Sequence, residues 1–208
     1  MTLVELIVAG AISVMLLALV ASLFIRTIQT QQVVDSAAAN ANEAKLAFDD
    51  MQSSVRLAVQ TDVRSSTNMT AVPTGGRGDV LVVKSRRNEG AVTDRGTWRC
   101  VAWHLASDGK LHRLVVAPVP ASGVAPARAS APADWPVVAS GVTAGGGQPP
   151  FRALDASPSV PAWYPGSVTL DLTFRAGEGK IPVGLQSTIA PRRQLLDAGV
   201  TPGGVPCV

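Results

Sequence analysis

The histidines and a glycine run are the first residues to examine for catalysis in this sequence. His104 and His112 stand eight residues apart on the two sides of a predicted hairpin turn, with no nucleophile or acid pattern beside them. Histidines in that setting usually face solvent, and this is what the sequence predicts for both. Gly145-Gly146-Gly147 precedes Gln148-Pro149-Pro150 rather than a helix with a lysine, so the run does not predict a phosphate-binding loop.

The remaining candidates for acid–base or metal chemistry are equally scattered. Asp134, Asp155 and Asp171 form no paired-carboxylate pattern, and neither a C-x-x-C motif nor histidine ligands at metal-binding spacing occur. The sequence therefore predicts that the protein is not an enzyme and needs no metal or cofactor.

One basic cluster offers a contact site for DNA or another surface. Trp98 and Trp103 lie near it in the sequence, and arginines interleaved with aromatic residues can bind nucleic acid. The alternative is a solvated loop beside two core tryptophans. The net charge of +3, with a pI of about 9.2, is too small to indicate DNA binding by itself. The arginines of the cluster are Arg86, Arg87, Arg95 and Arg99.

The chain has two cysteines, Cys100 and Cys207. An even pair in a domain outside the cytoplasm favours a disulfide, which would tie the C-terminus to the body of the domain. The alternative is two unrelated thiols, one in a strand and one near the end of the chain.

The N-terminal residues separate this chain from ordinary globular proteins. Residues 1–25 carry one formal charge, Glu5, although 16% of the 208 residues are charged. The twenty residues from Leu6 to Ile25 are uncharged, and as a helix they would span about 30 Å, the hydrocarbon thickness of a bilayer. A cleavable secretory signal would have a basic start and a shorter apolar core. A membrane-length helix is therefore the favoured interpretation.

Glu5 is the exception in this apolar stretch. A carboxylate in the membrane interior costs about 2.5–3.5 kcal/mol, so it needs a partner unless it lies at the interface. Its place near a helix N-terminus is favourable for negative charge. Two interpretations stay open: a cation at the same depth, such as the α-amino group of a neighbouring copy, or a glutamate that marks the end of the span.

The segment Met1-Thr2-Leu3-Val4-Glu5-Leu6-Ile7-Val8, followed by the apolar run, resembles the mature N-terminus of type IV pilins and of type II secretion pseudopilins. In that family a prepilin peptidase cuts just before an (F/M)-T-L-x-E motif, and the new N-terminus is methylated. The family most often has phenylalanine where this chain has Met1, and many major pilins carry a proline within the apolar run that is missing here.

The resemblance implies roles for the first residues and a set of partners. Met1 would be the processed and methylated residue, Thr2 and Leu3 would belong to the recognition and assembly motif, and Glu5 would set the register between subunits. The implied partners are other copies and related pilins, a prepilin peptidase and a pilus assembly platform. The protein would be a single-pass protein of the inner (cytoplasmic) membrane before assembly and part of an extracellular pilus at the cell surface afterwards.

The helix is expected to continue beyond the membrane segment. Apolar residues follow a 3-4 spacing that predicts one buried face, and no proline or glycine interrupts residues 11–72. The helix should therefore reach about residue 60. The stripe consists of Val34, Ala37, Ala41, Ala44, Phe48, Met51 and Val55.

The rest of the chain reads as a β-rich domain. Segments 97–106 and 111–117 flank Ser107-Asp108-Gly109-Lys110, a hairpin turn signal, and 167–175 alternates strictly and can pair with 183–190. Residues 79–85 predict a further strand. Residues 118–165 hold ten of the fifteen prolines and predict an irregular excursion with one short strand at 137–140.

These elements predict an α+β fold, a long N-terminal helix on an antiparallel sheet. The predicted parts are a membrane or filament-core helix (1–25), its amphipathic continuation (26–60) and a globular domain (61–208). The strand order also resembles, loosely, the larger minor pilins. Three functions remain: a type IV pilus subunit, a pseudopilin of a type II secretion system, or a membrane-tethered module that adheres to a host surface or binds DNA.

Overall fold

The computed structural model divides the chain into two compact units, Met1–Asn40 and Ala41–Val208. They are described separately below. The structure describes residues 3–72, 75–86, 91, 93–154, 166–175, 182–191 and 206–207.

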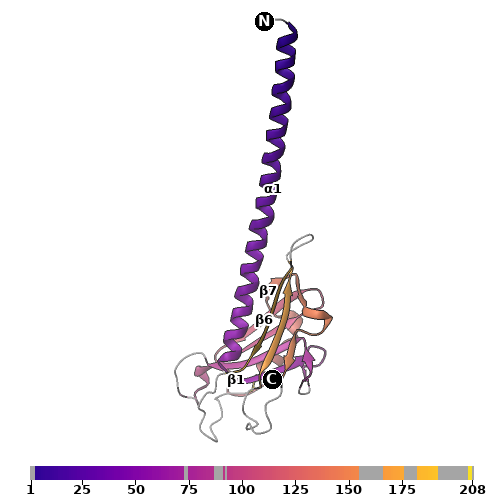
Figure 1. Ribbon diagram of the computed structural model, residues 1–208. Coiled ribbons are helices and arrows are strands. Elements are labelled where there is room, and N and C mark those ends of the chain that lie inside the picture. The colour runs from indigo at the N-terminus through magenta and orange to yellow at the C-terminus, as the bar shows by residue number, and fades with distance from the viewer. Residues whose placement is uncertain are drawn as a thin grey trace. The chain divides into compact units, whose positions relative to one another are not determined.

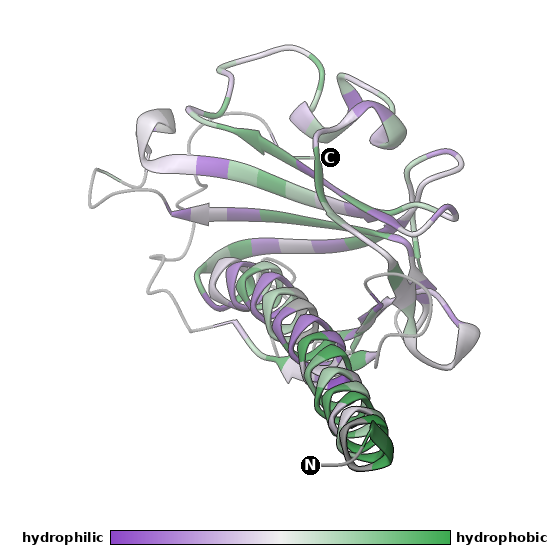
Figure 2. Ribbon diagram, turned by 90° about the horizontal axis from the view of Figure 1, so that it is seen from above, coloured by the Kyte–Doolittle hydropathy of each residue, from purple (hydrophilic) through white to green (hydrophobic). Residues whose placement is uncertain are grey.

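The first unit consists of the N-terminal part of helix α1 (Leu3–Arg56). Figure 2 shows that its turns near the N-terminus are almost uniformly hydrophobic, whereas later turns alternate between polar and apolar residues. A helix that is apolar on every side has no face to turn toward water and must be buried in lipid or in other proteins.

The second unit begins with the amphipathic end of the same helix. Ala44, Phe48, Met51 and Val55 are all buried in the core of this unit, which confirms this part of the predicted stripe. Val34, by contrast, is exposed in the first unit. The helix ends at Arg56, earlier than expected, because Ala58 already begins strand β1 (Ala58–Ser65), in which Val59 and Val63 are buried.

Strand β1 belongs to a six-stranded antiparallel sheet, here called sheet A, with the order β2-β1-β4-β5-β6-β7. Figure 1 shows its strands beside the C-terminal end of α1. The 107–110 hairpin joins β5 to β6, as predicted. The bounds are β2 (Thr70–Ala71), β4 (Val80–Arg86), β5 (Trp98–Leu105), β6 (Lys110–Val116) and β7 (Val137–Ser140).

The second sheet, sheet B, runs in the order β11-β10-β9-β3, with β8 also paired to β10. The predicted pairing of β10 with β11 is confirmed, with Val168 opposite Ile189. Gly141, at φ +69°, is the single residue between β7 in sheet A and β8 in sheet B. The bounds are β3 (Arg77–Gly78), β8 (Val142–Ala144), β9 (Phe151–Ala153), β10 (Val168–Phe174) and β11 (Val183–Ile189).

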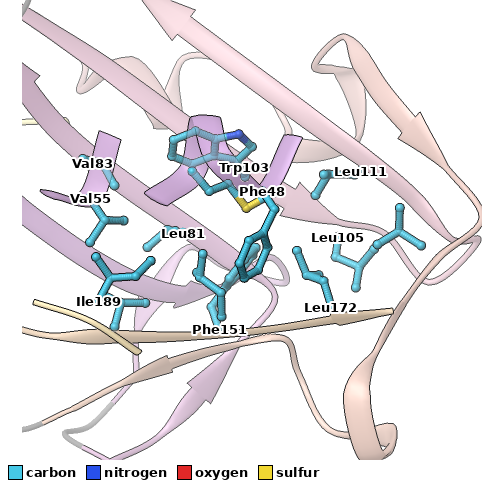
Figure 3. Close-up of a cluster of buried hydrophobic side chains, with 14 of the residues drawn as sticks. Phe48, Val55, Leu81, Val83, Trp103, Leu105, Leu111, Phe151, Leu172 and Ile189 are labelled. Carbon is cyan, nitrogen blue, oxygen red and sulfur yellow. The ribbon is translucent and has the colours of Figure 1, made fainter. Parts of the chain in front are cut away.

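The main core lies between the two sheets and the end of the helix. In Figure 3, Phe48 and Val55 of α1 meet Trp103 and Val83 of sheet A, with Phe151 of sheet B nearby. All of these side chains are buried. Burial of apolar area is worth about 25 cal/mol per Å², so this core is the main source of stability for the second unit. The predicted fold class, a long helix on an antiparallel sheet, is therefore confirmed.

Sheet A is also buried on its other face, which the sequence did not indicate. Residues 118–136, here called the cover segment, place Val119, Ala127 and Trp135 against Trp98 and the disulfide. The segment contains two short 3-10 helices, Pro126–Arg128 and Pro132–Asp134. This first part of the proline-rich excursion therefore forms a second core with sheet A.

Candidate functional site

The first unit exposes a long apolar surface along α1. The segment Ile7–Asp35 is long and apolar enough to cross a membrane, and no part of it is buried in the protein. The large apolar side chains that the structure describes between Leu3 and Val34 are exposed, for example Leu3 at 80%, Phe24 at 66% and Val34 at 59%. Soluble proteins rarely expose a continuous apolar surface of this kind, which marks a contact with lipid or protein.

The hydroxyl groups of Ser13, Ser22, Thr27 and Thr30 on this apolar surface are satisfied without water. Ser13 and Thr27 donate to carbonyl oxygens four residues earlier, at 2.9 Å in each case, and Ser22 donates to Leu19 O at 2.8 Å. A hydroxyl in hydrocarbon without a hydrogen bond would cost several kcal/mol by transfer estimates, about 4–8 kcal/mol into cyclohexane. The segment can therefore enter an apolar environment with these groups paired.

The residues assigned to processing and assembly are described only in part. Leu3 is the first residue of α1 and is exposed. Glu5 lies within α1, but its side chain is outside the described part of the structure, as are Met1 and Thr2 altogether. Glu5 is the third residue of α1 and so belongs to its first turn, where the dipole of a helix favours negative charge.

Cys100 and Cys207 form a disulfide between β5 and the C-terminal segment, with a Cα–Cα distance of 5.6 Å. Both residues are buried in the second core. The carbonyl oxygen of Cys207 also accepts a hydrogen bond from Ala127 N–H of the cover segment at 3.0 Å. The disulfide therefore joins sheet A to the C-terminal segment, which the hydrogen bond joins to the middle of the cover segment.

The proposed basic cluster is not one continuous surface among the described residues. In the β4–β5 register Arg86 is opposite Trp98 and Arg99 is opposite Ser85, so the two arginines project from opposite faces of sheet A. Arg99 Nε donates to Ser85 Oγ at 3.2 Å. Arg87 and the side chain of Arg95 lie outside the described residues.

The two tryptophans near the cluster are both core residues. Trp98 and Trp103 are fully buried on opposite faces of β5. Neither presents a ring on which a nucleic-acid base can stack.

The prediction that His104 and His112 face solvent is wrong. Both are buried, because the cover segment lies over their face of sheet A. They are directly opposite one another on β5 and β6, with ring centroids 5.7 Å apart. Nδ1 of His112 is 2.7 Å from the carbonyl oxygen of Trp135, and since a carbonyl only accepts, Nδ1 carries the proton.

His104 lies near the carboxylate of Asp79, a neighbour that the sequence did not predict. Its Nε2 is 3.8 Å from Asp79 Oδ2, while Asp79 also accepts hydrogen bonds from the amide (2.7 Å) and hydroxyl of Ser66. Burial lowers the pKa of His104, partly opposed by the Asp79 carboxylate. The order Ser66–Asp79–His104 places the carboxylate rather than the imidazole beside the hydroxyl, so it is not a Ser-His-Asp triad.

The register of β4 against β5 brings Asp79 to His104. Val80 is opposite His104, so the residue before β4 reaches the imidazole. Both strands were predicted, but their register was not. The contact between Asp79 and His104 depends on that register.

A groove of about 1480 Å³ opens at the end of the sheets, between the 107–109 turn and β8. Charges of both signs lie along it, namely Arg77, Asp79, Asp108 and Arg175. Asp171, one of the scattered aspartates, is 3.8 Å from Arg77 Nη1 and is not paired with Asp134, which is exposed on the cover segment. Asp155 lies outside the described residues, and within those described no three His, Cys, Asp or Glu side chains could hold a metal ion.

Comparisons with family models, with characterised proteins and with solved structures find no match to this chain.

Proposed function

We propose that this chain is a filament subunit of the type IV pilin kind, held in a membrane by the first part of α1 before assembly. The observation that carries the proposal is the exposed apolar surface of α1, next in the chain to an α+β unit. This arrangement fits a pilin-like architecture.

The helix then has two successive apolar environments, first lipid and then a bundle of the same helices from other subunits. Moving apolar side chains from lipid to such a bundle gains little, because both surroundings are equally apolar. Register between subunits must therefore come from polar groups. Glu5 would supply this by pairing with the N-terminal amine of a neighbouring copy, and buried charges are known to fix register in this way.

Processing would be carried out by a prepilin peptidase that cleaves before Met1, followed by methylation of the new amine. An assembly platform in the membrane would then draw the helix into the filament. Mass spectrometry of the N-terminal peptide tests this step, because it distinguishes a methylated Met1 from a longer leader or from cleavage within the apolar run.

The substitution Glu5→Gln tests the role of the carboxylate. It keeps the size of the side chain and removes the charge, so we expect membrane insertion to persist and filaments sheared from the cells to be lost. Asp35→Asn is the matched control, because Asp35 is an exposed acid elsewhere on the same helix unit. Filaments at the level of the parent protein in the Glu5→Gln strain would rule out the pairing role.

A pseudopilin of a type II secretion system is the second candidate, supported by the same helix. The two functions differ in location, since a pseudopilus stays within the cell envelope. Filaments sheared from the surface would contain this protein only if it is a pilus subunit. An adhesion or DNA-binding role predicts in addition that the full chain in detergent binds DNA with an affinity that falls as salt rises.

A further inference from the structure

The histidine pair joins the cover segment to sheet A. His112 donates from Nδ1 to the carbonyl oxygen of Trp135, and the Trp135 ring stands edge-on to His104 with the ring centroids 6.5 Å apart. Trp135 is itself buried in the second core, and its Nε1 donates to Ser130 Oγ within the cover segment at 3.0 Å. The two imidazoles are therefore covered only as long as this end of the cover segment is seated.

We propose that His104 and His112 form an acid-sensitive latch, which holds the Trp135 end of the cover segment on sheet A while the pair is neutral and releases it when the pair takes up protons. This inference concerns the second unit and is independent of the proposed filament role.

Burial and the neighbouring imidazole oppose protonation of His104 in the closed state, whereas the nearby carboxylates and the carbonyl of Pro132 favour it. The neighbours of His104 are His112 on β6, Asp79 just before β4, Asp108 in the hairpin turn and the carbonyl of Pro132 in the cover segment. Asp108 is already bound to Lys110 Nζ at 2.7 Å, and Asp134 of the cover segment is exposed. One proton on His104 can be balanced by Asp79, but a second would place two buried cations 5.7 Å apart.

Release of the cover segment would expose both imidazoles to water, where the pKa of His104 returns toward its ordinary value of about 6.5 and two cations no longer face each other in a buried site. Below that pH the open state then binds more protons than the closed state. By linkage, the ratio of open to closed molecules rises about tenfold per pH unit for each extra proton taken up.

The disulfide limits how far the cover segment can move. Ala127, in the middle of the cover segment, is hydrogen-bonded to Cys207, which is bonded to Cys100 in β5. Opening would therefore begin at Trp135 and stop short of Ala127. The surface uncovered is the part of sheet A around His104 and His112.

Hydrogen exchange of the full chain in detergent micelles tests the latch. Rates at pH 7.5 and 5.0 are corrected for the intrinsic pH dependence of exchange, and peptides covering 130–136 are compared with a β4 peptide. We expect protection at 130–136 to fall about tenfold or more at pH 5.0, with β4 unchanged. Unchanged protection at 130–136, or an equal fall in both peptides, would overturn the proposal.

The double variant His104→Gln/His112→Asn separates the latch from general acid sensitivity. Asparagine places a donor where Nδ1 of His112 stands, and neither amide titrates. We expect protection at 130–136 in the double variant to change less than twofold between pH 7.5 and 5.0, and a fall equal to that of the parent would contradict the latch.

NMR titration of the two imidazoles in the parent protein needs no variant. Both should take up protons together with the loss of protection at 130–136. Protonation of both without that loss would also refute the latch.

Discussion

Arg113 on β6 binds Asp50 on α1, with Nη2 3.0 Å from Oδ2 and 3.2 Å from Oδ1. The pair lies at the edge of the main core and joins the amphipathic end of the helix to sheet A. Both side chains are about one third exposed, at 30% and 32%, so solvent screens their attraction.

The first prediction concerns this pair. Asp50→Asn should lower the free energy of unfolding by about 1 kcal/mol or less, since ion pairs that are partly exposed to solvent rarely contribute more. Urea denaturation of the parent and the variant measures the difference. Asp49→Asn is the matched control, because the neighbouring Asp49 is exposed, and equal losses for the two variants would show that the ion pair contributes nothing specific.

The second prediction concerns Ser54, a buried residue of α1 whose Oγ has no hydrogen-bond partner among the described residues. Ser54→Ala removes an unpaired polar atom and improves helix propensity, so we expect stability to rise by about 1 kcal/mol. The same denaturation experiment measures it. Ser53 is exposed and donates to Asp50 O at 3.0 Å, so Ser53→Ala should give a smaller change; destabilisation by Ser54→Ala would mean that its hydroxyl is paired.

The third prediction concerns the disulfide. Cys100 and Cys207 are 107 residues apart, and cross-links of that span contribute about 2–5 kcal/mol. Reduction of the parent should lower its denaturation midpoint accordingly. The double variant Cys100→Ala/Cys207→Ala should show a similar loss of stability and no further response to reductant. A midpoint unchanged by complete reduction, checked by thiol titration, would exclude a stabilising bond.

The fourth prediction concerns Lys84, which is buried on the covered face of sheet A. Burial lowers its pKa to about 8, against 10.5 in an unfolded chain. Between these values the unfolded state holds more protons, so the free energy of unfolding should rise as the pH increases from 8 to 10. Lys84→Met should lack this component, and the difference between the two stability profiles isolates it. Parallel profiles would mean that Lys84 keeps an ordinary pKa.

The sequence predicted most of the secondary structure because the local signals were strong. The stripe through Phe48 and Met51 identified the buried face of the helix, and the turn at 107–110 identified the β5–β6 hairpin. The end of the helix was placed a few residues late, since nothing between Val55 and Val59 breaks a helix. Val59 and Val63 instead favour a strand once sheet A is present to pair with them.

The contacts of the candidate sites were less accessible to sequence reasoning. The burial of His104 and His112 depends on residues 118–136, a proline-rich segment without periodicity that was expected to be an irregular excursion. Asp79 reaches His104 through a strand register, and Arg86 and Arg99 separate for the same reason. Register depends on packing between segments distant in the chain, which no local pattern encodes.

The Cys100–Cys207 bond also changes what a cut in the chain would do. All of the cover segment, β6 to β11 and the loops between them lie between the two cysteines. A protease that cleaves any one peptide bond in this stretch produces two fragments, one with Cys100 and one with Cys207, and the disulfide keeps them covalently joined. A protein exposed outside the cell could therefore be nicked there and remain one molecule until the bond is reduced.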